Sequence, residues 1–385
     1  MTQVLIVAAE ASSTLYAQRL LEHWQKQEVP VQAFGIGSRQ MEALGFEPLA
    51  RSEDLAVVGI QEVLAHWSEI KSAFHGLVKA AQERRPKVAL LLDYPDFNLR
   101  LAKKLKALGI PVVYYISPQL WAWRTSRIKT VKQAVDKMLV LFPFEVDFYR
   151  QHQVDVEFVG HPLLDEMEER FFSEEDFHFR RSRYGLGPQD KLLGLMPGSR
   201  KSELKHHLKT QMETARRMVA AQPRLRVALL VAPGLDVEYV RSLLPEDLNF
   251  SLILMQAEPF PMIQLCDALL CASGTATLMV GLMQKPMVVM YKMNPLSAFL
   301  AKRFVRSTKY FAMINLILDE LVVPELFQEE AQPERLQKEL IPLLFDPQGR
   351  KEVQERLSAA RALLGEQGAT ARVAKALEVY LAGDQ

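Results

Sequence analysis

The stretch Val88-Ala-Leu-Leu-Leu-Asp93-Tyr-Pro-Asp96-Phe-Asn98 decides the fold class of this chain of 385 residues. Its apolar run ends abruptly at Asp93. Such a run is typical of a strand buried in a parallel sheet, and open α/β sheets bind ligands where their strands end. Aspartate is also common in turns and at the start of helices. We interpret Asp96 as a cap of the following helix and Asp93 as a candidate for chemistry.

Similar apolar runs occur on both sides of this stretch and alternate with amphipathic segments. The expected strands of a first half are 4–9, 31–36, 88–93, 112–116, 138–142 and 156–159. A second set is expected at 192–196, 227–232, 251–255, 268–272 and 287–291, and helices are expected at, for example, 12–26 and 57–82. This alternation predicts an α/β fold made of two Rossmann-like domains, each a parallel sheet between helices.

Composition along the chain suggests where these domains begin and end. The segment 165–176 is rich in Glu and Asp and carries no strand pattern, so we interpret it as a connection. We expect a first domain at 1–165 and a second at 166–345. The remainder, 346–385, is expected to form helices, with return to the first domain as one possibility.

Charge and cysteine content exclude several classes of protein. A formal net charge of +1 gives no reason to expect a nucleic-acid partner. Cys266 and Cys271 share one apolar segment and are expected to be buried thiols in a reducing compartment. The first residues lack the basic region of a signal peptide, and no apolar run reaches about 18 residues. We therefore expect a cytosolic protein that is able to touch a membrane surface.

Two turns in the second half are suited to a phosphate. Pro197-Gly198-Ser199-Arg200 follows one expected strand, and Ser273-Gly274-Thr275 follows another. Glycine permits close backbone approach, helix amides attract an anion, and arginine can clamp it. Either turn alone would also fit an ordinary strand-to-helix connection. Neither fits a Walker motif, and the first strand lacks a dinucleotide glycine fingerprint, so a nucleoside diphosphate is the better hypothesis.

Several motifs, taken together and in order, resemble the lipid-A-disaccharide synthase family. They are Ala9-Glu10-Ala-Ser12, Asp93-Tyr-Pro-Asp96-Phe-Asn98, Tyr115-Ile-Ser117-Pro118-Gln-Leu-Trp121-Ala-Trp123-Arg124, Phe158-Val-Gly160-His161-Pro162, Pro197-Gly-Ser-Arg200, Ser273-Gly-Thr-Ala-Thr277, Met290-Tyr-Lys-Met-Asn-Pro295, Asn315-Leu-Ile and Pro324-Glu-Leu-Phe-Gln328. The resemblance implies a GT-B type glycosyltransferase. Members transfer a diacylglucosamine from UDP to the 6-hydroxyl of diacylglucosamine 1-phosphate, with inversion at the anomeric carbon and release of UDP.

The resemblance and the chemistry together suggest roles for individual residues. An inverting transfer needs a base and a group that stabilises the departing diphosphate. Asp93 is the candidate base, and Arg200 is the principal candidate for the diphosphate, so no metal or cofactor is invoked. Gly198, Ser199, Ser273, Gly274 and Thr275 are the further candidate diphosphate binders.

Other candidate site residues keep two interpretations. Glu10 either orients the acceptor or caps the next helix, and His161 either contacts the donor or is structural. Trp121 and Trp123 either line an acyl groove or pack a loop, with Arg124 facing solvent or phosphate. The resemblance alone suggests that further residues bind substrate, namely Ser12, Asn98, Ser117, Asn315 and Gln328.

Association with a membrane and with a second copy is also considered. A stripe at helical spacing is formed by Ile60, Val63, Leu64, Trp67, Ile70 and Phe74. Most such stripes are core, but the acylated substrates of the family make a peripheral contact with the inner membrane plausible, and polar neighbours argue against deep insertion. A homodimer is considered possible.

Five positions depart from the family pattern. Ala9 and Ser13 replace glycines, Thr14 replaces an acid, Met279 replaces a glutamate, and Ile314 replaces a proline. These changes leave room for a second hypothesis, a catalytically impaired relative that binds a sugar nucleotide or a partner. A third is an enzyme like UDP-N-acetylglucosamine epimerase, which would not explain the Trp-Ala-Trp-Arg segment.

Overall fold

The computed structural model describes residues 2–52, 67–118, 120, 125–294 and 309–382. The chain divides into two compact units, Met1–Glu166 with Leu364–Gln385 and Met167–Leu363. The expected helical segment 346–385 is shared between them, because α17 (Pro347–Leu363) lies in the second unit and α18 (Ala369–Leu381) in the first.

The first unit contains a parallel sheet in the order β3-β2-β1-β4-β5-β6-β7. Its strands are β1 (Thr2–Ala8), β2 (Val31–Gly37), β3 (Glu47–Arg51), β4 (Val88–Leu92), β5 (Val112–Tyr115), β6 (Lys137–Val140) and β7 (Val156–Phe158). All of its described pairings are parallel. The strand order runs outward in both directions from β1 and β4, which places a topological switch point between these two strands.

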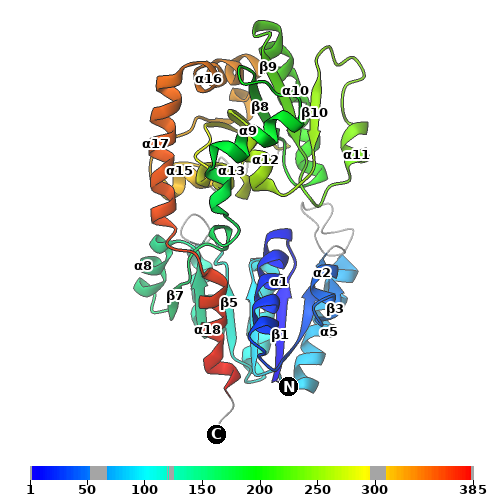
Figure 1. Ribbon diagram of the computed structural model, residues 1–385. Coiled ribbons are helices and arrows are strands. Elements are labelled where there is room, and N and C mark those ends of the chain that lie inside the picture. Colours follow the sequence, from blue (N-terminus) through cyan, green and yellow to red (C-terminus); the bar gives the residue numbers. More distant parts are fainter. Residues whose placement is uncertain (1, 53–66, 119, 121–124, 295–308, 383–385) are drawn as a thin grey trace. The chain divides into compact units, whose positions relative to one another are not determined.

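Helices cover both faces of this sheet (Figure 1). They are α1 (Ala11–Lys26), α2 (Arg39–Glu42), α5 (Trp67–Arg84), α6 (Pro95–Ala107), α7 (Ile128–Ala134) and α8 (Pro143–Gln151), with short helices η1 (Thr125–Arg127) and η2 (Pro162–Leu164). The C-terminal helix α18 packs beside α1. On the other face, Leu5, Leu91 and Tyr114 of the sheet join a core that includes Leu77 of α5 and Leu101 of α6.

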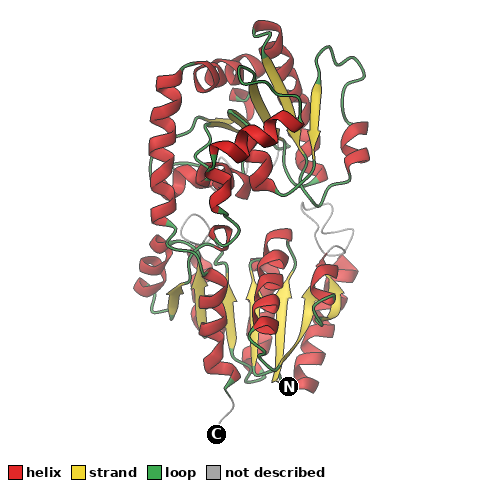
Figure 2. Ribbon diagram, viewed as in Figure 1, coloured by secondary structure: helices red, strands yellow, loops and turns green. Residues whose placement is uncertain are grey.

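The second unit contains a parallel sheet in the order β10-β9-β8-β11-β12-β13. Its strands are β8 (Lys191–Met196), β9 (Leu225–Leu230), β10 (Leu252–Met255), β11 (Ala268–Ala272), β12 (Met287–Tyr291) and β13 (Glu325–Phe327). Here the switch point lies between β8 and β11, which pair directly. The strands and their covering helices are distinguished by colour in Figure 2.

The helices of the second unit complete its layers. They are α9 (Glu174–Arg183), α10 (Lys201–Ala221), α11 (Val237–Ser242), α12 (Pro259–Leu265), α13 (Thr275–Leu282), α15 (Met313–Leu318) and α16 (Pro333–Phe345), with α17 and short helices η3 (Glu169–Phe172) and η4 (Gln328–Glu330). Helices α10 and α16 pack against each other and enclose one core with the sheet. Cys266 and Cys271 are buried free thiols in this unit.

Two strands were absent from the sequence expectations. β3 (Glu-Pro-Leu-Ala-Arg) and β13 (Glu-Leu-Phe) are edge strands in which charged residues and Pro48 interrupt the apolar run. The expected helix at 57–82 is described only from Trp67, where α5 begins, and its part at 57–66 lies outside the described residues. Asp96 is within the first turn of α6 rather than its cap, because Tyr94 occupies the cap position.

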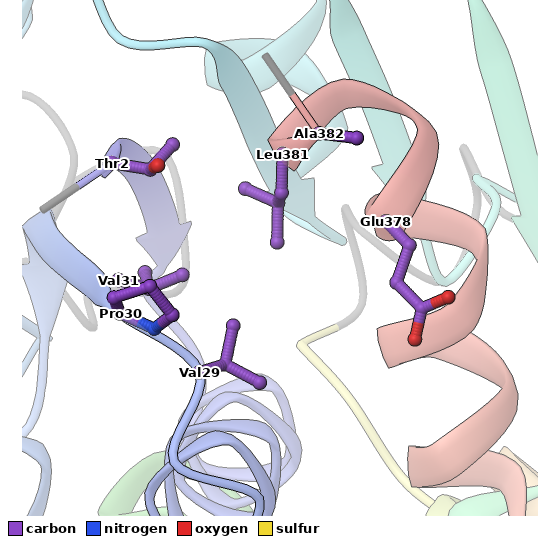
Figure 3. Close-up of a pocket in the computed structure, with 7 residues that line it drawn as sticks. All are labelled: Thr2, Val29, Pro30, Val31, Glu378, Leu381 and Ala382. Carbon is purple, nitrogen blue, oxygen red and sulfur yellow. The ribbon is translucent and has the colours of Figure 1, made fainter. Parts of the chain in front are cut away.

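A pocket of about 240 Å³ lies at the amino ends of β1 and β2 (Figure 3). Its lining residues are Thr2, Val29, Pro30, Val31, Glu378, Leu381 and Ala382. Ligands of open α/β sheets bind at the carboxyl ends of strands. A ligand of this sheet is therefore expected at the carboxyl ends of its strands, on the side opposite this pocket.

Candidate functional site

Two carboxylate residues follow the strands that flank the switch point of the first unit. Glu10 comes shortly after β1 and Asp93 directly after β4, and these strands pair so that Ala8 lies opposite Leu92. Both carboxylate residues are partly buried. The register thus brings the backbone at Glu10 and at Asp93 to the carboxyl ends of two neighbouring strands.

The turn at Asp93 has an unusual backbone. Asp93 and Tyr94 both have a φ of 48°, in the left-handed region that favours glycine. The carbonyl of Asp93 accepts hydrogen bonds from the Tyr114 hydroxyl at 2.5 Å and from Asn98 Nδ2 at 2.8 Å. Strain of this kind gathers at functional sites when surrounding contacts hold it in place. The turn is therefore a fixed platform for the Asp93 carboxylate.

The structure places Asn98 beneath this turn. Its side chain is fully buried and donates to the carbonyls of both Leu92 and Asp93. Its Oδ1 atom has no hydrogen-bond partner among the described residues. Contacts of this kind shape the backbone around Asp93, a role that the sequence did not reveal.

Glu10 occupies the cap position of α1. Its backbone N–H donates to Ser13 Oγ at 3.0 Å, and the same hydroxyl donates to the Glu10 carbonyl at 2.8 Å. Ser13 is fully buried, while Ser12 is partly exposed in the first turn of α1. The serine at position 13 thus stabilises the local backbone around Glu10.

Ser117 belongs to a buried polar cluster after β5. Its hydroxyl lies 2.6 Å from Glu145 Oε1, and the Tyr149 hydroxyl donates to Ser117 Oγ at 3.2 Å. Glu145 Oε2 in turn accepts the backbone N–H of Phe142. Ile116, just before Ser117, has a φ of 67°, which is strained for a β-branched residue. This cluster holds a second strained turn, on the strand next to β4.

His161 is a buried structural cap in the described part of the first unit. Its Nδ1 accepts the backbone N–H of Leu163 at 3.2 Å, at the start of η2. Burial lowers the pKa of His161 from 6.5 to about 3, so the imidazole is neutral at physiological pH. Its ring lies 6.4 Å from that of Tyr16. Trp121, Trp123 and Arg124 lie outside the described residues.

The first of the two turns expected to bind a phosphate follows β8 at the switch point of the second unit. Gly198 has a φ of 131°, and Arg200 is the cap residue of α10. The side chain of Arg200 is 42% exposed and lies 3.5 Å from the carboxylate of Glu203, measured from Nη1 to Oε1. The Ser199 N–H donates to the other Glu203 oxygen at 2.8 Å. An amide and a guanidinium thus converge at the start of a long helix.

The second expected turn follows β11, the neighbour of β8. Ser273 donates its hydroxyl to the carbonyl of Phe311 at 3.0 Å. Gly274 has a φ of 156° and is the cap residue of α13, and an added side chain there would meet no atom within 4 Å. Thr275, the first residue of α13, is exposed. This open helix start is suited to approach by a ligand.

His207 was missed by the sequence analysis. It is fully buried on α10, with Nδ1 2.8 Å from the Pro197 carbonyl, and Nε2 3.1 Å from the Lys292 amide and 3.0 Å from the Lys292 carbonyl. Burial lowers the pKa of His207, so the neutral ring donates to Pro197 and accepts from the Lys292 amide. The histidine therefore ties the loop after β8 to the loop after β12. A histidine on an apolar helix face is the only sequence signal.

The side chains of Asn315 and Gln328 also form hydrogen bonds with backbone groups. The Asn315 side chain is buried, accepts from Val322 and Val323, and donates to Val323 and Glu325. Gln328 donates to the carbonyl of Met293 at 3.1 Å. Both side chains hold loops in place after β12 and around β13, and their expected contact with substrate stays a prediction.

Comparison with known proteins shows to which family the chain is related. A family model described as lipid-A-disaccharide synthetase matches residues 4–379. A lipid-A-disaccharide synthase of Anaeromyxobacter dehalogenans is 42% identical over 97% of this chain and 96% of its own. One of Nitrosococcus oceani is 41% identical over 99% and 97%.

The chain belongs to the lipid-A-disaccharide synthase family. It is therefore a glycosyltransferase. The family and the enzyme class that the sequence motifs implied are confirmed. The predicted α/β fold class is confirmed by the two parallel sheets.

Solved structures agree on the fold. A UDP-N-acetylglucosamine 2-epimerase of Listeria monocytogenes has a TM-score of 0.65 at 12% identity, covering 100% of this chain and 97% of its own. A glycotransferase of kitacinnamycin has a TM-score of 0.64 at 16% identity, covering 98% of both chains. At such identity the likeness concerns the two-domain α/β fold that glycosyltransferases and epimerases share.

Two departures from the lipid-A-disaccharide synthase pattern have a local explanation. Ile314 is fully buried, and its side chain packs so closely on Gly281 of α13 that no Cβ would fit there. The hydroxyl of Ser13 forms hydrogen bonds with the backbone N–H and the carbonyl of Glu10. Met279, where the family pattern has glutamate, is partly buried on α13, and nothing in the structure explains it.

No helix within the described residues is long and apolar enough to cross a membrane. Within the same residues, no group of three His, Cys, Asp or Glu side chains is placed to hold a metal ion.

Proposed function

We propose that the protein forms the β(1→6) lipid A disaccharide 1-phosphate from UDP-2,3-diacylglucosamine and 2,3-diacylglucosamine 1-phosphate, with release of UDP. The observation that carries the proposal is the family match over residues 4–379. The positions of a carboxylate and of an arginine loop at the switch points of the two sheets support it. We assign the acceptor to the first domain, 1–165, and the UDP-sugar to the second, 166–345.

The reaction is a single displacement in this proposal. The oxygen of the acceptor 6-hydroxyl forms a bond to the anomeric carbon of the donor on the face opposite UDP. The bond from that carbon to the diphosphate oxygen breaks, and its electron pair leaves with UDP. Asp93 accepts the proton of the attacking hydroxyl. Backside attack inverts the anomeric configuration, which converts the α-linked donor into the β product.

Asp93 is suited to the role of base for two reasons. Its backbone is held by Tyr114 and Asn98, so little reorganisation is needed at the moment of reaction. It also stands at the edge of the sheet where α/β enzymes place their chemistry. General base catalysis typically contributes about 10²- to 10⁴-fold to the rate. Glu10, on the neighbouring strand, is the candidate that orients the acceptor.

Arg200 is proposed to stabilise the departing diphosphate. It caps α10, whose 21 residues provide a helix dipole that points its positive end at the same place. Gly198, Ser199 and the helix start at Ser273, Gly274 and Thr275 would add amide and hydroxyl donors. Because these groups are cationic or polar, the mechanism needs no bound metal. We propose that His207, Asn315 and Gln328 position these loops, that His161 holds the turn at η2, and that Ser12 and Ser117 contribute to the substrate sites.

The acylated substrates also suggest where the protein works. We propose a cytoplasmic enzyme that associates peripherally with the inner membrane, because both proposed substrates carry acyl chains that favour a bilayer. Trp121 and Trp123 are proposed to line a groove for the acyl chains, with Arg124 facing a phosphate group. A homodimer stays a prediction.

The test is an assay of the purified protein with both lipid substrates. Disaccharide and UDP should form in equal amounts, and excess EDTA should not reduce the rate. Arg200→Ala should weaken UDP binding and transfer together, since a charge-assisted contact is worth about 1.5 to 3 kcal/mol. Arg216→Ala is the matched control, because Arg216 pairs with Glu213 further along α10. Measurable UDP binding without disaccharide formation would favour the catalytically impaired relative.

A further inference from the structure

The proposed diphosphate loop already holds an anion, the carboxylate of Glu203. Its Oε2 accepts the Ser199 N–H at 2.8 Å, and its Oε1 lies 3.5 Å from Arg200 Nη1. These are two of the donors that the proposed function assigns to the diphosphate. The side chain is 16% exposed, so the carboxylate lies mostly in the protein.

The Glu203 side chain also packs closely against the backbone of Gly198. A Cβ added to Gly198 would clash with the Glu203 side chain, with Glu203 Cβ only 2.5 Å away. The Glu203 side chain therefore covers the glycine at the point where a phosphate would approach the backbone most closely. Glycine here makes room for an internal carboxylate as well as for a ligand.

We propose that Glu203 competes with the diphosphate of UDP for the loop formed by Gly198, Ser199 and Arg200. UDP binding must either displace this carboxylate or accept a like charge a few ångströms away, and both reduce affinity. The competition lowers the affinity for the released product, so UDP leaves the loop faster after transfer. The inference rests on the proposed function and adds a residue that sets the affinity of its diphosphate site.

If Glu203 acts only as a helix cap, removing its charge should not strengthen UDP binding. Glu203 is the third residue of α10, a position where glutamate often accepts an amide at the helix start. If capping were its whole role, removing the charge would loosen the loop and weaken UDP binding or leave it unchanged. Glu203→Gln separates the two readings, because glutamine keeps an oxygen for the Ser199 amide and removes only the negative charge.

The experiment is calorimetric titration of the full chain with UDP, uridine and inorganic pyrophosphate. For Glu203→Gln we expect UDP and pyrophosphate to bind about tenfold more tightly than for the parent protein, and uridine to bind equally. UDP should also inhibit turnover of the variant at a correspondingly lower concentration. Glu213→Gln is the matched control, since Glu213 lies on the same helix and pairs with Arg216 instead.

Several outcomes would overturn the inference. These are UDP binding by Glu203→Gln that is weaker or unchanged, an equal gain for uridine, or a parent protein that does not bind UDP. Thermal unfolding of the variant checks that the fold is retained, and Glu203→Asp, which keeps the charge on a shorter side chain, should not show the full gain. A parent protein that binds UDP but forms no disaccharide would refute the proposed function alone, because the affinity comparison does not depend on transfer.

Discussion

Asp93 and Tyr94 show how a single turn is prepared for chemistry at the scale of residues. A left-handed conformation costs a non-glycine residue about 1–2 kcal/mol, and two such residues follow each other here. The hydrogen bonds from Tyr114 and Asn98 to the Asp93 carbonyl offset part of this cost. The conformation of the turn therefore depends on side chains from β5 and α6.

The first prediction concerns Asp93→Asn. Asparagine has nearly the same volume and keeps the turn, but it cannot accept the proton of the acceptor hydroxyl. Turnover should fall by about 10²- to 10⁴-fold, while the dissociation constant for UDP stays the same. Steady-state assays and calorimetry measure the two quantities. Asp96→Asn, on the exposed first turn of α6, is the control and should keep near-normal turnover; near-normal turnover in Asp93→Asn would move the base to Glu10.

The second prediction concerns His161 and pH. Burial lowers the pKa of His161 from 6.5 to about 3, so between these values the unfolded chain binds a proton that the folded chain does not. The free energy of unfolding should therefore fall as the pH drops from about 6.5 to about 3. This group alone should remove about 2 kcal/mol between about pH 7 and about pH 5.

His161→Asn tests this linkage. Asparagine offers an oxygen to the Leu163 amide and does not titrate, so urea unfolding of the variant should lose less stability between the two pH values than the parent protein loses. Equal slopes for His161→Asn and the parent protein would contradict a buried neutral imidazole.

At the scale of elements, polar contacts fix the start of α18 on the first unit, in addition to its apolar packing beside α1. Asp165 accepts the backbone N–H groups of Gly368, Ala369 and Thr370 at 2.6, 3.2 and 3.1 Å. Arg372 of α18 donates to the Val159 carbonyl at 2.7 Å. A carboxylate at a helix start satisfies orphan amides and is favoured by the helix dipole.

The third prediction is that Asp165→Ala loosens α18. Losing this cap should cost about 2 kcal/mol, which corresponds to about thirtyfold faster exchange of the α18 amides if they exchange through local opening. Hydrogen exchange read by mass spectrometry measures it. Asp236→Ala removes the corresponding cap of α11 in the second unit and should leave α18 unchanged. Similar α18 exchange in the two variants would show that the cap is dispensable.

At the scale of the whole molecule, the two units should respond differently to UDP. A ligand stabilises the part of a protein to which it binds, by about 2.7 kcal/mol at 100 times its dissociation constant. We predict that UDP slows hydrogen exchange in the loops after β8, β11 and β12. The amides of β1 and β4 should be affected much less. Protection confined to the first unit would contradict the assignment of UDP to the second domain.

Much of this architecture follows from the sequence alone. Central strands such as β4 and β11 bury both faces, so their apolar runs are continuous and visible without any partner. The turns at Asp93, Gly198 and Ser273 follow directly from those strand ends. Family membership was visible for a related reason, since its motifs gather in the same turns. The edge strands β3 and β13 were missed, because charged residues and a proline interrupt their apolar pattern.

Only the tertiary structure decided which polar side chains form hydrogen bonds with distant parts of the backbone. Gln328 and Met293 are 35 residues apart, His207 and Lys292 are 85 apart, and Asp165 and Gly368 are 203 apart. Local periodicity carries no information about such partners, since a hydrogen bond depends on which segments the folded chain brings within about 3 Å. The apolar pattern therefore determined the sheets and their edges, whereas the three-dimensional packing decided which polar groups at those edges are already in use.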